Sequence, residues 1–106
     1  MNRILGGLAG VAFALIPGIA AAETLIVADA SQIKWSVMDN KVYFRNFDEI
    51  NSSWQGCCYT YYIDLATDGG RAMFSVFLTR SAARQRLNFF ANRTANPSQI
   101  TQIGDW

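Results

Sequence analysis

The sequence of 106 residues contains no histidine. Histidine is the commonest general base in enzymes and a frequent metal ligand, so a serine–histidine triad and a histidine-based metal site are excluded. The two cysteines, Cys57 and Cys58, are adjacent and do not provide the Cys-x-x-Cys spacing of redox enzymes. The sequence therefore predicts a protein that is not an enzyme and that needs no metal and no cofactor.

Clustered carboxylates are the remaining source of catalysis, and they occur only as Asp48 with Glu49 and as Asp64 with Asp68. Paired carboxylates can hydrolyse glycosidic bonds when both line one cleft. Neighbouring residues on a loop or strand usually point apart, however, so solvated charge or helix capping explains these residues better. We expect Asp68 to cap the N-terminus of a helix.

Residues 1–22 are predicted to be a secretory signal peptide, with Arg3 before an apolar run over 4–16 and small residues before Glu23. The apolar run is shorter than the roughly 20 residues that a membrane-spanning helix needs. We therefore expect a periplasmic or secreted protein with no membrane span after cleavage. Residues 23–106 are predicted to form one domain, whose small core would benefit from a disulfide or an oligomer contact.

Charge of one sign does not dominate residues 23–106, because loss of Arg3 leaves eight basic residues against eight acidic ones. A formal charge of zero predicts no nucleic-acid partner. The distribution is uneven, since seven acidic residues precede Gly69 and five arginines follow it. These charges could pair the two halves of the chain, pair neighbouring subunits, or simply be solvated.

The hydrophobic period changes twice between Tyr59 and Phe90. Large residues occupy every second position over 59–65, which predicts a strand, and Asp68–Gly70 interrupts this pattern. Apolar residues then recur at helical spacing over 71–82, and 87–90 again reads as a strand. The predicted order in this region is strand, helix, strand.

Three further strands complete the predicted layout. Residues 33–37 and 42–45 form a hairpin around the turn 39–41, and residues 100–103 form a short last strand. Residues 23–31 could add to a sheet edge or be disordered. Five strands with one helix between the third and fourth predict an α+β, mainly β fold: a partly open Greek-key barrel of the oligonucleotide/oligosaccharide-binding (OB) type, coiled into one closed sheet.

Residues 58–65, 72–79 and 86–90 together resemble a group of small exported bacterial proteins. In that group a cysteine precedes a tyrosine-rich strand that ends in aspartate, and an Ala/Leu/Ser helix and a further strand follow. The layout is similar to that of the B subunits of subtilase-type and pertussis-like toxins. This resemblance implies an OB-type barrel that binds cell-surface glycans and assembles as a homo-oligomer, a pentameric ring. The resembled proteins usually have a partner cysteine after the fourth strand, whereas no cysteine follows Cys58 here.

Cys57 and Cys58 lie in a predicted loop that leads into the third strand. In an oxidising compartment they could form a vicinal disulfide, remain two free thiols, or bridge to another chain.

Candidate ligand-binding residues are Trp54, Tyr62, Phe90 and Arg93. Tyr62 and Phe90 are expected to point outward from their strands, and beside Arg93 they could stack a sugar; a helix or a neighbouring subunit could equally cover them. Trp54, in a polar loop, could be a second sugar platform or could fold onto the end of the barrel.

The sequence thus predicts an exported, non-enzymatic binding module that contacts a glycan or a protein through loops and outward aromatic residues. The alternative is a periplasmic inhibitor or adaptor that binds one protein partner through Trp54 and the Cys57–Cys58 loop.

Overall fold

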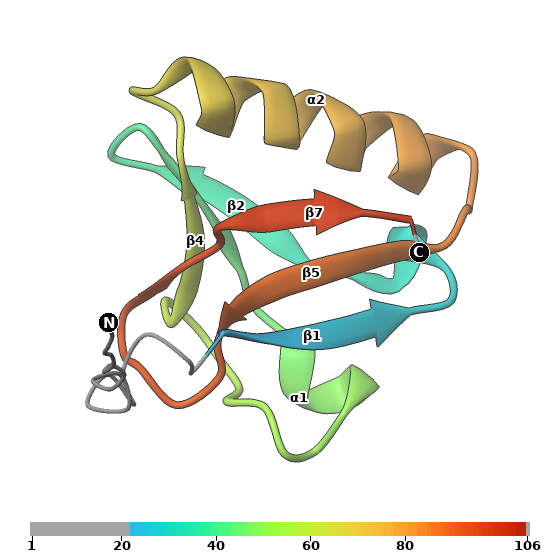
Figure 1. Ribbon diagram of the computed structural model, residues 1–106, viewed down its shortest axis with the longest axis vertical. Helices are drawn as coiled ribbons and strands as arrows, with labels where there is room; N and C mark the ends of the chain where they lie inside the picture. Colours follow the sequence, from blue (N-terminus) through green and yellow to red (C-terminus); the bar gives the residue numbers. More distant parts are fainter. Residues whose placement is uncertain (1–21, 106) are drawn as a thin grey trace, which may run out of the picture.

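The computed structural model describes residues 22–105 (Figure 1). The predicted signal peptide, residues 1–22, lies outside the described residues except for Ala22. Within residues 22–105, no helix is both long enough and apolar enough to cross a membrane.

The smaller of two sheets has three antiparallel strands in the order β1-β5-β7. These strands are β1 (Ala22–Val27), β5 (Leu87–Asn92) and β7 (Gln102–Gly104). β1 pairs with the whole of β5, from Ala22 opposite Asn92 to Val27 opposite Leu87. The sequence allowed residues 23–31 either to add to a sheet edge or to be disordered. The structure shows the first: β1 is an edge strand, and it buries Leu25 and Val27.

The larger sheet has four strands in the order β2-β3-β4-β6, in which only β4 and β6 run parallel. These strands are β2 (Trp35–Met38), β3 (Lys41–Phe44), β4 (Tyr61–Asp64) and β6 (Ser98–Gln99). The predicted hairpin is confirmed as β2 and β3. Its turn residues Asp39 and Asn40 have φ of 52° and 60°, the left-handed conformation that Asp and Asn tolerate in tight hairpins.

The predicted helix is confirmed as α2 (Asp68–Ala82), between β4 and β5. Its N-cap is Thr67, so the assignment of the cap to Asp68 was wrong. The backbone N–H of Gly70 donates to Thr67 Oγ1 at 2.9 Å, the usual capping bond, while Asp68 begins the helix and pairs with Arg71. A short helix α1 (Phe47–Ile50) and a single 3-10 turn, η3 (Ala30–Gln32), lie in segments without a predicted element.

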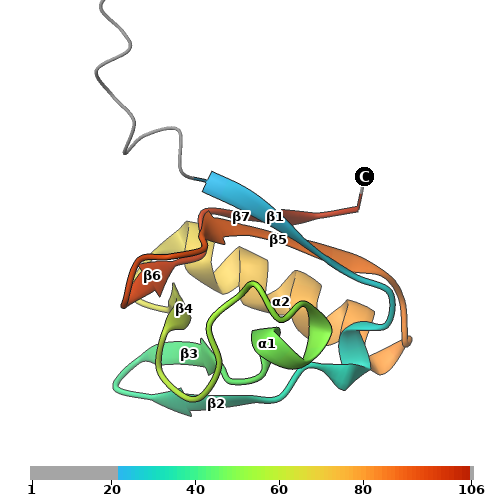
Figure 2. The same ribbon diagram turned by 90° about the horizontal axis from the view of Figure 1, so that it is seen from below.

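The two sheets form separate layers with the core between them (Figure 2). Both helices lie between the two layers, with α2 along one edge of the molecule and α1 at the opposite edge (Figures 1 and 2). The buried core consists mainly of large apolar residues from both sheets, α1 and α2: Leu25, Val27, Val42, Phe44, Phe47, Trp54, Tyr61, Ile63, Phe77, Leu87, Phe89 and Ile100. The prediction of an α+β, mainly β fold with one main helix is therefore confirmed.

The prediction of one closed sheet was wrong, because the described strands form two sheets and not a closed barrel. The predicted last strand divides at Ile100 and Thr101. The N–H of Ile100 donates to the carbonyl of Tyr62 at 2.8 Å, whereas the N–H of Thr101 donates to the carbonyl of Phe90 at 2.9 Å. The chain thus leaves β4 and joins β5 within two residues, which ends β6 in one sheet and starts β7 in the other.

Candidate binding face

The larger sheet has one buried side and one solvent-facing side. Val42, Phe44, Tyr61 and Ile63 alternate along β3 and β4 and are fully buried. The intervening side chains must point the other way, because successive residues of a strand face opposite sides. The register sets Tyr43 directly opposite Tyr62 on that outer side, and their ring centroids are 6.0 Å apart.

Tyr59 extends this pair into a row of three rings. Its ring meets Tyr43 edge-on, with centroids 5.3 Å apart and planes at 87°, and the residue is 49% exposed. Edge-to-face contact is a favoured arrangement of aromatic rings. We call Tyr43, Tyr59 and Tyr62, with the flanking cations Lys41 and Arg45, the tyrosine face.

The two cations of the tyrosine face lie over aromatic rings. Lys41 Nζ is 5.9 Å from the centroid of the Tyr62 ring, and Arg45 Cζ is 5.5 Å from that of Tyr59, both within cation–π range. Within residues 22–105 neither cation forms an ion pair. By contrast, four other arginines pair with carboxylates: Arg71, Arg80, Arg84 and Arg93.

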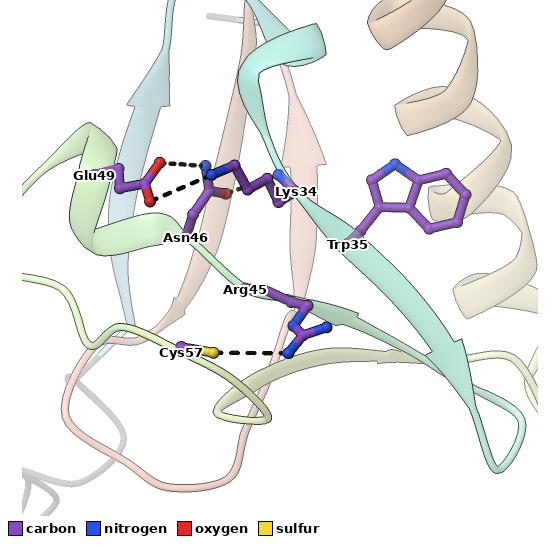
Figure 3. A pocket seen from close by; sticks show the side chains of 6 residues that line it. All are labelled: Lys34, Trp35, Arg45, Asn46, Glu49 and Cys57. Carbon is purple, nitrogen blue, oxygen red and sulfur yellow. Dashed lines mark hydrogen bonds and ion pairs between the residues drawn. The ribbon is translucent and has the colours of Figure 1, made fainter.

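A pocket of about 310 Å³ adjoins the tyrosine face at Arg45 (Figure 3). Its lining residues are Lys34, Trp35, Arg45, Asn46, Glu49 and Cys57. Arg45 Nη2 donates to Cys57 Sγ at 3.7 Å, and Lys34 Nζ lies 3.6 Å from a Glu49 carboxylate oxygen. The guanidinium of Arg45 therefore contributes both to the pocket and to the row of rings.

Asn46 fixes one wall of this pocket, because its buried amide joins residues 32–34 to helix α1. Its Oδ1 accepts from the N–H of Lys34 at 2.8 Å. Its Nδ2 donates to the carbonyl of Gln32 at 3.0 Å and to Glu49 Oε1 at 3.1 Å. With each polar atom of its side chain satisfied, Asn46 is a structural residue that positions Lys34 and Glu49.

The sulfur atoms of Cys57 and Cys58 lie in direct contact, the arrangement of a vicinal disulfide. Of the three alternatives that the sequence left open, this geometry matches the bond between neighbours. Cys57 is exposed and faces Arg45, which brings the pair to the rim of the pocket.

Trp54 lies in the core. It is 4% exposed, meets Phe47 edge-on at 5.8 Å and packs against Tyr61 with centroids 5.3 Å apart. Trp54 is thus packed within the core, which is the alternative to the sugar platform.

Tyr62 and Phe90 do not share a face, because they belong to different sheets. Tyr62 is on β4 and faces outward beside Tyr43, whereas Phe90 is on β5, half-buried, opposite Thr24 of β1 and Gln102 of β7. Their expected pairing depended on a single continuous sheet.

Arg93 is engaged within the protein. Its Nε lies 2.8 Å from Glu23 Oε1, and its Nη1 donates to the carbonyl of Ser53 at 2.8 Å. This ion pair links the acidic and basic halves of the chain, as does the pair between Arg84 and Asp29 at 3.9 Å. Pairing between the two halves, one of the three alternatives for the uneven charge, therefore occurs.

Three of the four clustered carboxylates, Glu49, Asp64 and Asp68, have partners in the local structure. Glu49 contacts Lys34 and Asn46, and Asp64 Oδ1 accepts from the N–H of Ala66 at 2.9 Å. Asp68 pairs with Arg71 within the first turn of α2. Within the described part of the chain, no three potential metal ligands among His, Cys, Asp and Glu are grouped as a metal ion would need.

Sequence reasoning identified Tyr62 but missed Tyr43, Tyr59, Lys41 and Arg45. The signal was present, since the two-residue period of β3 sets Tyr43 and Arg45 on one side and Val42 and Phe44 on the other. Only the register between β3 and β4 reveals that Tyr43 adjoins Tyr62.

Comparison of the chain with protein-family models, with curated proteins and with solved structures finds no match.

Proposed function

We propose that this protein is an exported, non-enzymatic binding module that holds a glycan on the tyrosine face. The observation that carries the proposal is a row of three outward tyrosines whose neighbouring cations rest on rings and not on carboxylates. Such a row has no role in the core, which lies on the other side of the sheet.

The chemistry of the tyrosine face suits a sugar. Tyrosine rings offer apolar faces for the C–H side of a pyranose, and their hydroxyls can exchange hydrogen bonds with sugar hydroxyls. Lys41 and Arg45 supply further donors at the two ends of the row, and Arg45 retains donor N–H groups beyond the one directed at Cys57. Aromatic rings with a few oriented polar groups are typical of small-molecule sites.

The proposal includes an OB-type barrel that is open at two places. Two short connections support it: β1 leads to β2 through η3, and β6 leads to β7 through Ile100 and Thr101. If each of these pairs is taken as one bent strand, five strands with a helix between the third and fourth remain, which is the OB order. The resemblance to toxin B subunits adds glycan binding only by analogy of fold.

A protein ligand is the second candidate, and the pocket beside Cys57 favours it. Trp35 and Cys57 are exposed at this pocket, next to the Lys34–Glu49 ion pair. An inhibitor or adaptor would use the pocket and the Cys57 loop, without Trp54. Pull-down from periplasmic extract that captures one protein, together with an empty glycan array, would favour this candidate over the first.

The test of glycan binding uses the protein purified after export. A glycan array selects an oligosaccharide, and calorimetry then compares wild type with Tyr43→Ala. Loss of an aromatic contact worth about 0.5–1.5 kcal/mol should weaken binding roughly two- to tenfold. Ile26→Ser is the matched control, because Ile26 is an exposed apolar residue (58%) on the other sheet. Equal losses for the two variants, or an array with no ligand, would contradict the proposal.

A further inference from the structure

Strand β2 is the outer strand of the larger sheet, and one of its edges has no neighbouring strand within residues 22–105. Trp35, Val37 and Met38 are 39%, 51% and 42% exposed, so most of this four-residue strand presents apolar side chains to solvent. Natural edge strands are usually protected by proline, by lysine or by a bulge. The segment Trp-Ser-Val-Met contains no proline and no charged residue.

The hydrogen bonding of the hairpin defines which backbone groups face this open edge. The N–H of Arg45 donates to the carbonyl of Lys34 at 2.8 Å, so Lys34 and Arg45 occupy a bonded position of the ladder, next to Trp35 opposite Phe44. Bonded and non-bonded pairs alternate along an antiparallel ladder. Trp35 and Val37 are therefore at non-bonded positions, and their N–H and C=O groups point away from β3.

We propose that β2 pairs antiparallel with β2 of a second copy of this chain, about a two-fold axis at Ser36. In this register Trp35 of each copy lies opposite Val37 of the other, so that every outward N–H meets an outward carbonyl. Trp35 and Val37 also form an apolar cross-strand pair on one side of the joined sheet. The small side chains of the two Ser36 residues meet on the axis without a clash.

Charge supports a second copy as the occupant of this edge. Lys34 precedes β2 and the exposed Asp39 follows it. Antiparallel pairing brings Lys34 of one copy opposite Met38 of the other, next to Asp39. Opposite charges then approach at both ends of the interface, whereas a parallel arrangement would bring like charges together.

The dimer has a functional consequence, and that consequence rests on the proposed function. A two-fold axis perpendicular to the sheet leaves both tyrosine faces on the same side of a continuous eight-stranded sheet, so the dimer would bind two sugars of one surface at once. A four-residue edge buries less than the roughly 1,200–2,000 Å² of a stable interface, so we expect association that depends on protein concentration.

Sedimentation velocity of the exported protein, without ligand and over a range of concentrations, tests the pairing. We expect a monomer–dimer equilibrium that Val37→Lys shifts to monomer by at least tenfold and that Ile26→Lys, at the exposed edge of the other sheet, leaves unchanged. As a second measurement, Ser36→Cys should form a dimer on oxidation that a non-reducing gel detects, independently of whether Val37→Lys folds.

A wild-type protein that stays monomeric at high micromolar concentration would overturn the proposal. So would a ring of higher order, or a dimer that Ile26→Lys disrupts and Val37→Lys does not. Since no ligand is present, failure here leaves the tyrosine face untouched. Loss of sugar binding in a Val37→Lys monomer, measured with a single soluble oligosaccharide, would count against the tyrosine face instead.

Discussion

Among Gly56, Gly69 and Gly70, alanine should be least tolerated at Gly70, because the first turn of α2 lies close to the end of β4. A Cβ atom added to Gly70 would lie 1.8 Å from the carbonyl oxygen of Asp64 and 2.8 Å from the carbonyl carbon. Both are backbone atoms that cannot rotate away, so the helix itself would have to move. Gly69, its neighbour in the same helical turn, provides the control, since its added Cβ would meet no atom within 4 Å.

The two substitutions should have opposite effects on the free energy of unfolding. Overpacking costs about 1–3 kcal/mol in general, and a clash with backbone belongs at the upper end of that range. Gly69→Ala should stabilise the protein by about 0.4–1 kcal/mol, because it reduces the entropy of the unfolded chain.

Urea unfolding followed by circular dichroism measures both effects. With a slope of about 1–3 kcal/mol per M, Gly70→Ala should lower the midpoint by about 1 M or more, and Gly69→Ala should raise it slightly. If Gly70→Ala were as stable as wild type, the close approach of α2 to β4 would be refuted.

Three further predictions concern residues of the core and the loops. Trp54→Ala should lower the free energy of unfolding by about 3–5 kcal/mol, because it leaves a cavity in the core. If the tyrosine face binds sugar as proposed, the folded fraction should bind it as wild type does, and calorimetry that shows no binding would make Trp54 part of the binding site. Tyr61→Phe should lower the free energy of unfolding, measured in urea, by about 1–3 kcal/mol. The reason is that the buried hydroxyl accepts from the N–H of Gln55 at 3.0 Å and donates to the carbonyl of Arg93 at 2.6 Å; an unchanged midpoint would contradict these bonds. The hydroxyl and the N–H of Ser31 donate to Asp29 and lower the pKa of its carboxyl below 3.8, with a smaller effect of the Arg84 charge. The ionised Asp29 carboxylate therefore stabilises the fold; this stabilisation is complete above the unfolded pKa and is lost as the pH falls through the lower folded pKa. Because Ser31→Ala removes the hydroxyl donor, it should raise the pKa of Asp29 in an NMR titration. An unmoved pKa would contradict this assignment.

Local elements could be predicted because their signals lie within a few residues. The hairpin turn at Asp39 and Asn40 and the change of period before α2 depend on backbone preference and on neighbouring side chains. The division of the last strand at Ile100 depends on which distant carbonyl each N–H reaches, and no local pattern encodes that choice. The expected closed sheet was wrong for this reason.

In the candidate site, too, local features could be predicted and contacts between distant segments could not. The outward direction of Tyr62 came from the two-residue period, but its neighbours depend on the register with β3. The polar segment around Trp54 allows either a surface or a packed position, and only its contacts with Phe47 and Tyr61 decide for the core. The ion pair of Arg93 with Glu23 joins residues that are 70 positions apart in the sequence and could not be read from either segment alone.

The most direct test of the binding face is an NMR titration of protein labelled in its tyrosine rings. The chain has four tyrosines, three on the tyrosine face and Tyr61 in the core as an internal control. On addition of the oligosaccharide that a glycan array selects, we predict shifts of the ring signals of Tyr43, Tyr59 and Tyr62 and an unmoved Tyr61. Bound sugar that leaves those three signals in place would contradict the account.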